Sequence, residues 1–222
     1  SSKVVDTKLT EQSGRGAIGG LFGSVKSLKN LDVIDCHTNV EITCNPRFEG
    51  KSAVVGGLVG DMQAMNPKGE VAFSYCSSSG SLTTYESSGG LIGHNSSMVL
   101  IEFCVSSLAI ECHYEGVSCG GLLGNTASGS STTIFNSFSS SYLYSSDNAI
   151  VGGLVGSVRA GTCYLTSSTY AGTIFGNTQN GGAVVGYMPS DVSQTIKNDH
   201  TFNGVVYDRF LCNLPAVRNV EG

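Results

Sequence analysis

A five-residue motif, Gly-Gly-Leu-x-Gly, recurs along this chain at nearly regular intervals. Five copies begin at Gly19, Gly56, Gly89, Gly120 and Gly152, and a weaker copy, Gly-Ala-Val-Val-Gly, begins at Gly182. Successive copies begin 37, 33, 31, 32 and 30 residues apart. A period of about 20–50 residues indicates a stack of similar units, because one unit of that size cannot bury its own apolar side.

A second pattern keeps the same phase between the copies of the motif. It consists of an apolar residue, a small residue three positions later, and an apolar residue six positions after that. Its copies are Val33/Cys36/Ile42, Phe73/Cys76/Leu82, Ile101/Cys104/Ile110, Ile134/Ser137/Leu143 and Leu165/Ser168/Ile174, with a degraded copy at Phe202/Val205/Leu211. We predict that the small residues Cys36, Cys76, Cys104, Ser137 and Ser168 form an inner ladder.

The local periodicity is that of β-strands. Apolar and polar residues alternate in residues 40–44 (Val-Glu-Ile-Thr-Cys) and residues 108–112 (Leu-Ala-Ile-Glu-Cys), as in half-buried strands. We predict three short strands in each unit: one at the glycine motif, one around the Cys or Ser position, and one at the alternating segment. Few stretches have the spacing of an amphipathic helix, so the predicted fold class is all-β.

Units of this kind stack as a parallel β-helix, also called a β-solenoid, with neighbouring strands about 4.8 Å apart. We predict about six coils of roughly 30 residues, wound in the right-handed sense usual for parallel crossovers. The predicted inner apolar ladder is Leu21, Leu58, Leu91, Leu122, Leu154 and Val184. Residues 1–222 are expected to form one domain. Residues 1–15 form a cap or continue a longer chain, and residues 187–222 form a divergent last coil and a C-terminal cap.

Glycine has a structural role in this scheme. It tolerates a positive φ angle and lets two backbones approach closely, so we expect it to form a tight corner at each end of the motif. The structural glycines are predicted to be Gly19, Gly23, Gly56, Gly60, Gly89, Gly93, Gly120, Gly124, Gly152, Gly156, Gly182 and Gly186. Flexible linkers are also rich in glycine, but the regular Leu, Val or Ile between these glycines disfavours a linker.

The repeat resembles the GLUG motif, which is named for its Gly-Leu-Gly pattern. The resemblance is carried by runs such as residues 134–138 (Ile-Phe-Asn-Ser-Phe) followed by residues 151–156 (Val-Gly-Gly-Leu-Val-Gly), and it covers about residues 16–212. Proteins of this type are often large surface or secreted polypeptides, some of them adhesive. The resemblance therefore implies a scaffold or surface module, and it implies no catalytic residues, because the motif has none.

Composition restricts the possible partners. Charged residues make up 13% of the chain and the formal net charge is −5. The chain has no run of Lys or Arg, which disfavours nucleic acid binding. No apolar run reaches the length of a membrane span, so we expect no membrane insertion by this segment. We also expect no cofactor.

Eight cysteines are present, and an even number in a secreted protein suggests disulfides. Their positions favour another interpretation, in which most are reduced and act as small buried side chains. Cys36, Cys76 and Cys104 share one repeat position, Cys44 and Cys112 share another, and Cys119 replaces a valine of other copies. Disulfides between stacked coils remain possible. Cys163 and Cys212 lie outside these ladders and are the better candidates for pairing or exposure.

A metal or catalytic site has little support. The pairs Cys36-His37 and Cys112-His113 would point to opposite faces of a strand, and no Cys-x-x-Cys occurs, so we predict no metal site. General acid–base cleavage of a polysaccharide would need two converging carboxylates. The candidates are Asp35, Glu41, Glu102 and Glu111. They form no ladder across neighbouring coils, and His94 aligns with an exposed turn position.

Three functions remain. The first is a non-catalytic structural or adhesive segment of a larger surface, secreted or filament-forming protein, whose partners are other copies or other surface proteins. The second is a module that binds glycan or protein on one face, with the candidate contacts Tyr75, Tyr85, Tyr114, Tyr142 and Tyr144. The third is a carbohydrate-active enzyme. We expect an extracellular or cell-surface location, while reduced cysteines leave an intracellular assembly open.

Overall fold

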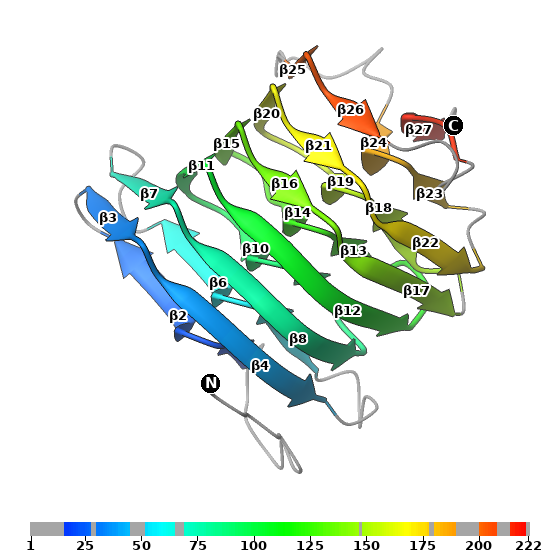
Figure 1. Cartoon of the computed structure of the whole chain (residues 1–222), viewed down its shortest axis with the longest axis horizontal. Coiled ribbons are helices and arrows are strands. Elements are labelled where there is room, and N and C mark those ends of the chain that lie inside the picture. The colour runs from blue at the N-terminus through cyan, green and yellow to red at the C-terminus, as the bar shows by residue number, and fades with distance from the viewer. Residues whose placement is uncertain are drawn as a thin grey trace.

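The computed structural model describes residues 16–27, 30–44, 52–64, 69–146, 148–177, 180–189, 200–207 and 214–220. Within these ranges the chain is all-β and contains no helix (Figure 1). A search of the same residues for a helix long and apolar enough to cross a membrane found none. The strands assemble into four parallel sheets, here named A to D, which run the length of a β-solenoid. The predicted fold class is therefore confirmed.

Sheets A and B contain the strands on either side of the glycine motif. Sheet A consists, in order, of β1 (Gly16–Gly19), β5 (Ala53–Gly56), β9 (Ser88–Gly89), β13 (Ser118–Gly120), β18 (Ile150–Gly152) and β23 (Gly181–Gly182). Sheet B consists of β2 (Phe22–Ser27), β6 (Val59–Ala64), β10 (Ile92–Asn95), β14 (Leu123–Thr126), β19 (Val155–Val158), β24 (Val185–Pro189) and β27 (Val217–Val220).

Sheets C and D contain the strands on either side of the Cys or Ser position. Sheet C consists of β3 (Leu31–Ile34), β7 (Glu70–Ser74), β11 (Met98–Glu102), β15 (Ser131–Phe135), β20 (Thr162–Thr166) and β25 (His200–Asn203). Sheet D consists of β4 (His37–Thr43), β8 (Ser77–Thr84), β12 (Val105–His113), β16 (Phe138–Ser139) with β17 (Tyr142–Ser146), β21 (Thr169–Tyr170) with β22 (Thr173–Gly176), and β26 (Val206–Tyr207).

Each repeat thus contributes strands to four sheets rather than the predicted three, and in the fourth and fifth coils the sheet D strand is split in two. In the second coil the path runs through β5, β6, β7 and β8, one strand in each sheet. The glycine motif is not a strand of its own but the turn between sheets A and B. Neighbouring coils pair in parallel and in register, as in the column Val33–Phe73–Ile101–Ile134–Leu165 of sheet C. The repeat spacing in the sequence is therefore the spacing of one full coil.

The turn between sheets A and B points into the interior of the solenoid. A Cβ atom on Gly57 would lie 2.0 Å from Ser78 Oγ, on the inner face of sheet D. A Cβ atom on Gly56 would lie 1.9 Å from the carbonyl oxygen of Val59. Gly90 and Gly121 have the same relation to Ser106 and Ser139 in the next two coils. Glycine is needed here because a backbone packs directly against a sheet, with no room for a side chain.

The predicted positive φ angles are not at this turn. Among the described residues, none of the motif glycines has a positive φ, so that part of the prediction is wrong. The left-handed conformation instead occurs at the corner between sheets C and D, just before the Cys or Ser position. The residues there are Asp35, Tyr75, Phe103, Asn136 and Ser167, with φ of 55°, 58°, 53°, 45° and 50°, and Gly204 follows in the last coil with φ of 62°. One such residue per coil turns the chain from sheet C into sheet D.

A hydrogen-bonded ladder of small side chains supports this corner. The Cys76 N–H donates to Cys104 Sγ (3.3 Å), the Cys104 N–H to Ser137 Oγ (3.2 Å), and the Ser137 N–H to Ser168 Oγ (3.2 Å). The Ser137 hydroxyl also donates to the carbonyl oxygen of Phe135, two residues earlier, at 2.9 Å. Cys and Ser are interchangeable here because each offers one donor and one acceptor of similar size. Cys76, Cys104, Ser137 and Ser168 are buried at this corner, whereas Cys36 in the first coil is partly exposed.

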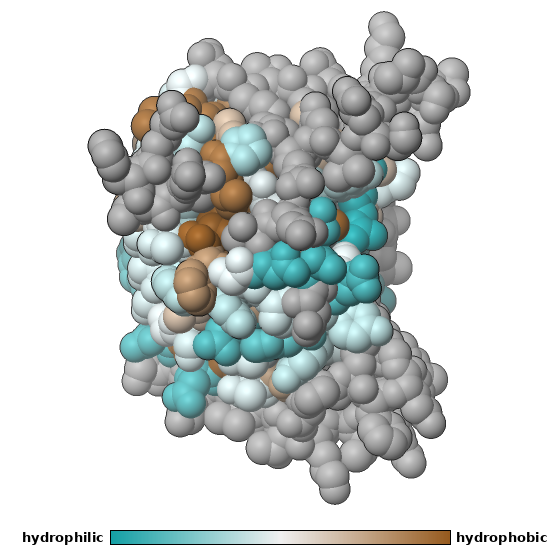
Figure 2. Space-filling view, turned by 90° about the vertical axis from the view of Figure 1, so that its right-hand side faces the viewer, coloured by the Kyte–Doolittle hydropathy of each residue, from teal (hydrophilic) through white to brown (hydrophobic). Residues whose placement is uncertain are grey.

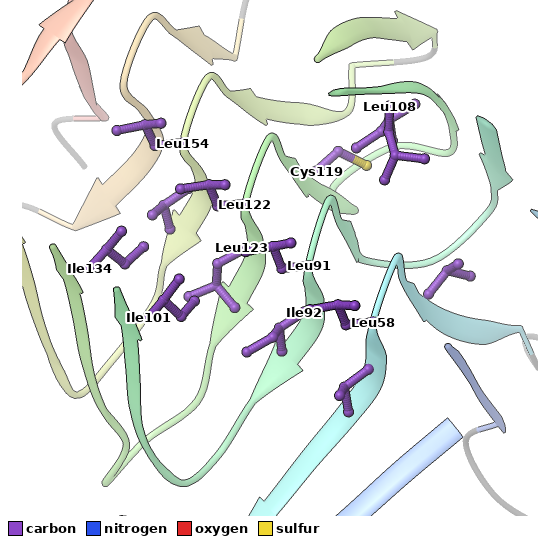
Figure 3. Packing of buried hydrophobic residues seen from close by; sticks show 14 of the residues in the cluster. Leu58, Leu91, Ile92, Ile101, Leu108, Cys119, Leu122, Leu123, Ile134 and Leu154 are labelled. Carbon is purple, nitrogen blue, oxygen red and sulfur yellow. The ribbon is translucent and has the colours of Figure 1, made fainter. Parts of the chain in front are cut away.

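The core lies between the inward faces of the four sheets. Figure 3 shows the motif leucines Leu58, Leu91, Leu122 and Leu154 following one another along the stack, with Ile101 beside them. These four leucines are fully buried, as predicted, and Val184 is 3% exposed. Leu21 departs from the prediction, because it is 38% exposed. It belongs to the first coil, whose strands lie at the end of each sheet.

The divergent segment 187–222 continues the stack where the structure describes it. Strand β25 pairs with β20, and β26 pairs with β21, so sheets C and D both extend into this segment. Strand β27 pairs with β24 in sheet B, with a shift in register between Val185 and Met188. Residues 1–15 lie outside the described residues.

We predict that Gly90→Ala lowers the free energy of unfolding by more than about 3 kcal/mol, because overpacking in the core has no relief here. The new Cβ would lie 2.0 Å from both the Gly121 carbonyl oxygen and Ser106 Oγ. Urea unfolding followed by circular dichroism measures the loss. The control is Gly129→Ala, where φ is +78° and no atom lies within 4 Å, so only backbone strain of about 1–2 kcal/mol applies. Equal losses in the two variants would contradict the steric argument.

We also predict different outcomes for two substitutions in the ladder. Cys104→Ser should change the free energy of unfolding by less than about 1 kcal/mol, because serine makes the same bonds in the next two coils. Cys104→Val should cost about 1–3 kcal/mol, since the Cys76 N–H loses the acceptor that the ladder provides. The same urea titration compares the two, and a valine variant as stable as the serine variant would refute the role of the ladder.

Candidate binding surface

The outer face of sheet D carries a strip of rings: Tyr85, His113, Tyr144, Phe175 and Tyr142. We call these five residues the ring strip. Inward and outward side chains alternate along these strands, so burial of Ile110 and Leu143 directs their neighbours outward. In register, Tyr144 lies beside Phe175 in the next coil. The strip runs along the solenoid axis and crosses four consecutive coils.

The rings of the strip lie in sequence with their centres close together. The centroid of Tyr85 is 5.4 Å from that of His113, which is 6.0 Å from that of Tyr144. Phe175 is 5.7 Å from Tyr144 and 6.5 Å from Tyr142. Phe175 and Tyr142 are 56% and 44% exposed, whereas Tyr85 packs partly against the core. The neighbouring rings therefore pack against each other, while Phe175 and Tyr142 keep part of their surface exposed to solvent.

Polar groups are interleaved with the rings. His113 Nε2 lies 3.3 Å from a carboxylate oxygen of Glu111, and His113 Nδ1 lies 3.2 Å from the Ser146 hydroxyl oxygen. The imidazole is thus fixed on both sides. The side chain of Glu111 is 51% exposed, so its carboxylate keeps acceptor capacity toward solvent.

The rest of this face is small and uncharged near the strip. Positions in register with the strip are occupied by Ser81, Ala109 and Thr173 in one column and by Thr83 in the next. Ser79 and Ser107 continue the same outer surface toward the start of the strands. Apart from the Glu111–His113 pair, no Asp, Glu, Lys, Arg or His lies in these columns from β8 to β22.

The five predicted tyrosines do not form one face. Tyr85, Tyr142 and Tyr144 join the strip, and Tyr114, which follows His113, is 44% exposed. Tyr75 lies at the opposite end of β8, at the corner with sheet C. There it stacks on Phe103, with ring centroids 5.1 Å apart and planes 5° apart. Phe103 in turn meets Phe135 edge-on at 5.7 Å.

Sequence reasoning missed His113, Phe175 and Phe103. The missed signal is the register itself. Once Cys104, Ser137 and Ser168 are aligned, Tyr144 and Phe175 fall at the same position, and so do Tyr75 and Phe103. Tyrosine is only one kind of ring residue, whereas the alignment of the outward positions groups all the rings.

The candidate carboxylates are dispersed. Glu102 lies on sheet C and accepts a hydrogen bond from the Ser74 hydroxyl at 2.8 Å, while Glu111 lies on sheet D beside His113. In the first coil, Asp35 is exposed and lies 3.1 Å from His37. No group of three or more His, Cys, Asp or Glu side chains suited to hold a metal ion occurs in the described part of the chain.

His94 is not at an exposed turn, contrary to the prediction. It lies on β10, is partly buried, and its Nδ1 hydrogen-bonds the side-chain oxygen of Asn125 in the next coil. The Asn125 amide donates to Ser87 Oγ, just before β9 of sheet A, at 3.0 Å. Sheets A and B each have one face that is directed away from sheets C and D. These two faces pack together, and this column lies between them. His94 was expected at a turn because it directly follows the glycine motif. In the structure, strand β10 has already begun at Ile92, before His94.

One pair of cysteines departs from the reduced ladders. Cys112 and Cys119 form a disulfide that joins β12 of sheet D to β13 of sheet A. The prediction treated them as members of separate columns, and these columns meet because the inner faces of sheets A and D pack together. The Ser88 hydroxyl donates to Cys119 Sγ at 3.2 Å. Cys36, Cys76 and Cys104 are free thiols, as predicted.

The environment of the thiols changes their ionisation. A hydrogen bond between the side chains of Cys76 and Cys104 lowers the pKa of Cys76 and raises the pKa of Cys104, so Cys76 ionises first. Cys163, expected to be exposed or paired, is instead a fully buried free thiol in register with Thr132. Burial raises its pKa to about 12. Cys212 lies outside the described residues.

The comparisons with known proteins give one partial relative. No family model matches the chain, and no solved structure matches it. Over 81 residues the chain is 32% identical to halomucin of Haloquadratum walsbyi, a stretch equal to 36% of this chain. The match spans 1% of the length of halomucin. A repeat protein is compatible with this similarity and with the solenoid.

We predict that Cys163 makes the protein less stable in alkali. Its folded pKa of about 12 exceeds the ordinary 9.0, so the unfolded chain binds fewer protons above pH 9. The contribution of Cys163 to the free energy of unfolding is constant below pH 9. It is lost as the pH rises toward 12, at up to about 1.4 kcal/mol per pH unit. Urea titrations from pH 7 to pH 11 measure it. Cys163→Thr, which introduces the residue that the same column carries as Thr132, should remove this component, and parallel pH profiles would contradict the assignment.

Proposed function

We propose that this chain is a non-catalytic structural segment of a longer surface solenoid, in which further coils stack on its first coil. The observation that carries the proposal is the exposure of the first coil. Leu21, Phe22 and Leu31 are 38%, 42% and 36% exposed. Their counterparts one coil later, Leu58, Val59 and Val71, are fully buried. Side chains of the first coil are therefore exposed at positions whose counterparts in the next coil are buried in the core.

The backbone at this end supports the same proposal. Strands β1, β2 and β3 are the terminal strands of sheets A, B and C, and β4 pairs only with β8. Unpaired strand edges in an otherwise parallel stack present hydrogen-bonding groups to any chain with the same spacing. Among the residues described, these are in-register edges of four to seven residues beside apolar side chains. A further coil of the same repeat satisfies both the edges and the exposed apolar side chains.

The setting of the protein rests on the comparison and on the repeat. A relative named as a mucin favours a surface or secreted location, and the disulfide between Cys112 and Cys119 is compatible with an oxidising compartment. The GLUG-like repeat supports a scaffold within a larger polypeptide. The dispersion of Glu102 and Glu111 over two sheets supports a role without catalysis, because cleavage of a glycosidic bond needs converging carboxylates.

We predict that the isolated chain associates through its first coil. Light scattering after gel filtration should give a mass that increases with concentration, and negative-stain images should show elongation along the solenoid axis. Leu21→Lys combined with Leu31→Lys should raise the concentration needed for association at least tenfold, because a buried charge opposes stacking.

The matched control is Val105→Lys, which places a lysine on the outer face of sheet D at a position that is 39% exposed. It should leave the association unchanged. A chain that stays monomeric at every concentration, or that associates equally in both variants, would rule out the first coil as a stacking surface.

A further inference from the structure

We propose that the ring strip on sheet D binds a neutral polysaccharide chain, laid along the solenoid axis. This function is independent of the stacking role, because the strip lies on the side of the solenoid and the stacking surface lies at its end. The strip consists of Tyr85, His113, Tyr144, Phe175 and Tyr142, with Glu111 and Ser146 between the rings.

The rings match the apolar faces of pyranose sugars. A pyranose ring carries C–H groups on its faces and hydroxyl groups around its edge. The face of an aromatic ring is electron-rich and attracts the slightly positive C–H groups. Tyr142 and Phe175 are the most exposed rings of the strip, at 44% and 56%, and Tyr144 continues the row. Three coil-to-coil steps of about 4.8 Å give the strip a length of roughly 14 Å, enough for a short oligosaccharide.

The interleaved polar groups match the hydroxyl edges of the same sugars. The Glu111 carboxylate is half exposed and accepts hydrogen bonds, which are stronger when the acceptor is charged. The phenol groups of Tyr142 and Tyr144 both donate and accept. His113 is held in place by Glu111 and Ser146. Binding a ligand therefore costs little conformational entropy at this side chain.

The charge of the strip favours a neutral ligand. Its carboxylate and its imidazole, those of Glu111 and His113, already pair with each other at 3.3 Å. The neighbouring positions in register are Ser81, Thr83 and Thr173. No lysine or arginine lies in these columns to select an acidic polysaccharide, and a single carboxylate would repel one.

The size of the strip disfavours a protein partner. A specific interface needs about 800 Å² from each side. Five rings that are about half exposed or less supply roughly 600 Å² at most, because a whole aromatic side chain buries about 150–250 Å². On the side of the solenoid shown in Figure 2, the residues coloured as hydrophobic form a narrow band among hydrophilic ones rather than a broad patch. The ring strip itself is a single row of rings. A row one side chain wide suits a linear chain better than a globular surface.

The experiment is isothermal titration with soluble neutral oligosaccharides, namely cellohexaose, chitohexaose and mannohexaose, followed by gel electrophoresis in the matching polysaccharides. We expect at least one of these ligands to bind. Phe175→Thr and Tyr144→Thr should each weaken that binding at least tenfold. Threonine is chosen because Thr83 occupies the same register position in the second coil, so the strand keeps a residue that it already accepts.

The control is Tyr75→Asn, which removes an exposed ring outside the strip and places there the residue found at the same corner as Asn136. It should bind like the unaltered protein. Circular dichroism shows whether each variant is folded, and exposed Phe175 provides the reading if Tyr144→Thr does not fold. The proposal is overturned if no neutral oligosaccharide binds or if the strip variants bind normally. It is also overturned if those variants instead abolish association between copies of the chain.

Discussion

The structure depends on the close packing of a bare backbone against the inner face of sheet D. The turn at Gly57 meets Ser78 with no side chain between them, and the next coils repeat this contact. Because the turn reaches the interior, sheets A and B line the core on one side and pack against each other on the other. Any larger residue at Gly57 or Gly90 would force the two halves of a coil apart. The glycines therefore determine the cross-section of the whole solenoid, and the leucines beside them fill it.

The opposite corner solves a different problem. A chain that leaves sheet C must turn sharply into sheet D, and it does so with one left-handed residue in each coil. For Tyr75 and Phe103 this conformation is costly, because bulky side chains rarely adopt it. The ladder from Cys76 to Ser168 opposes the cost, since its side chains bond the backbone on both sides of the corner. The residue at the corner itself can then vary widely, from Asp35 to Tyr75.

The sequence predicts the parallel stack, its period, the buried leucines and most of the small-residue ladder, because these follow from residues repeated at fixed spacing. It does not predict the fourth strand, since Gly56 and Val59 belong to one motif yet lie on different sheets. Cys112 and Cys119 appeared as separate columns because nothing in a linear pattern shows that sheets A and D face each other. His113 and Phe175 were missed for a similar reason: outward positions are free to vary, so their alignment is visible only through the register.

The in-register pairing of four sheets also has a mechanical consequence. Tension applied along the axis of the solenoid is shared by four ladders of backbone hydrogen bonds at every junction between coils. No single ladder bears the load, so neighbouring coils separate only when many bonds break together. A pull on a chain end instead meets the bonds of one strand after another, so the molecule should resist stretching and yield to peeling from a terminal coil. The solenoid should therefore be stiff under axial tension and should unfold first at its terminal coils.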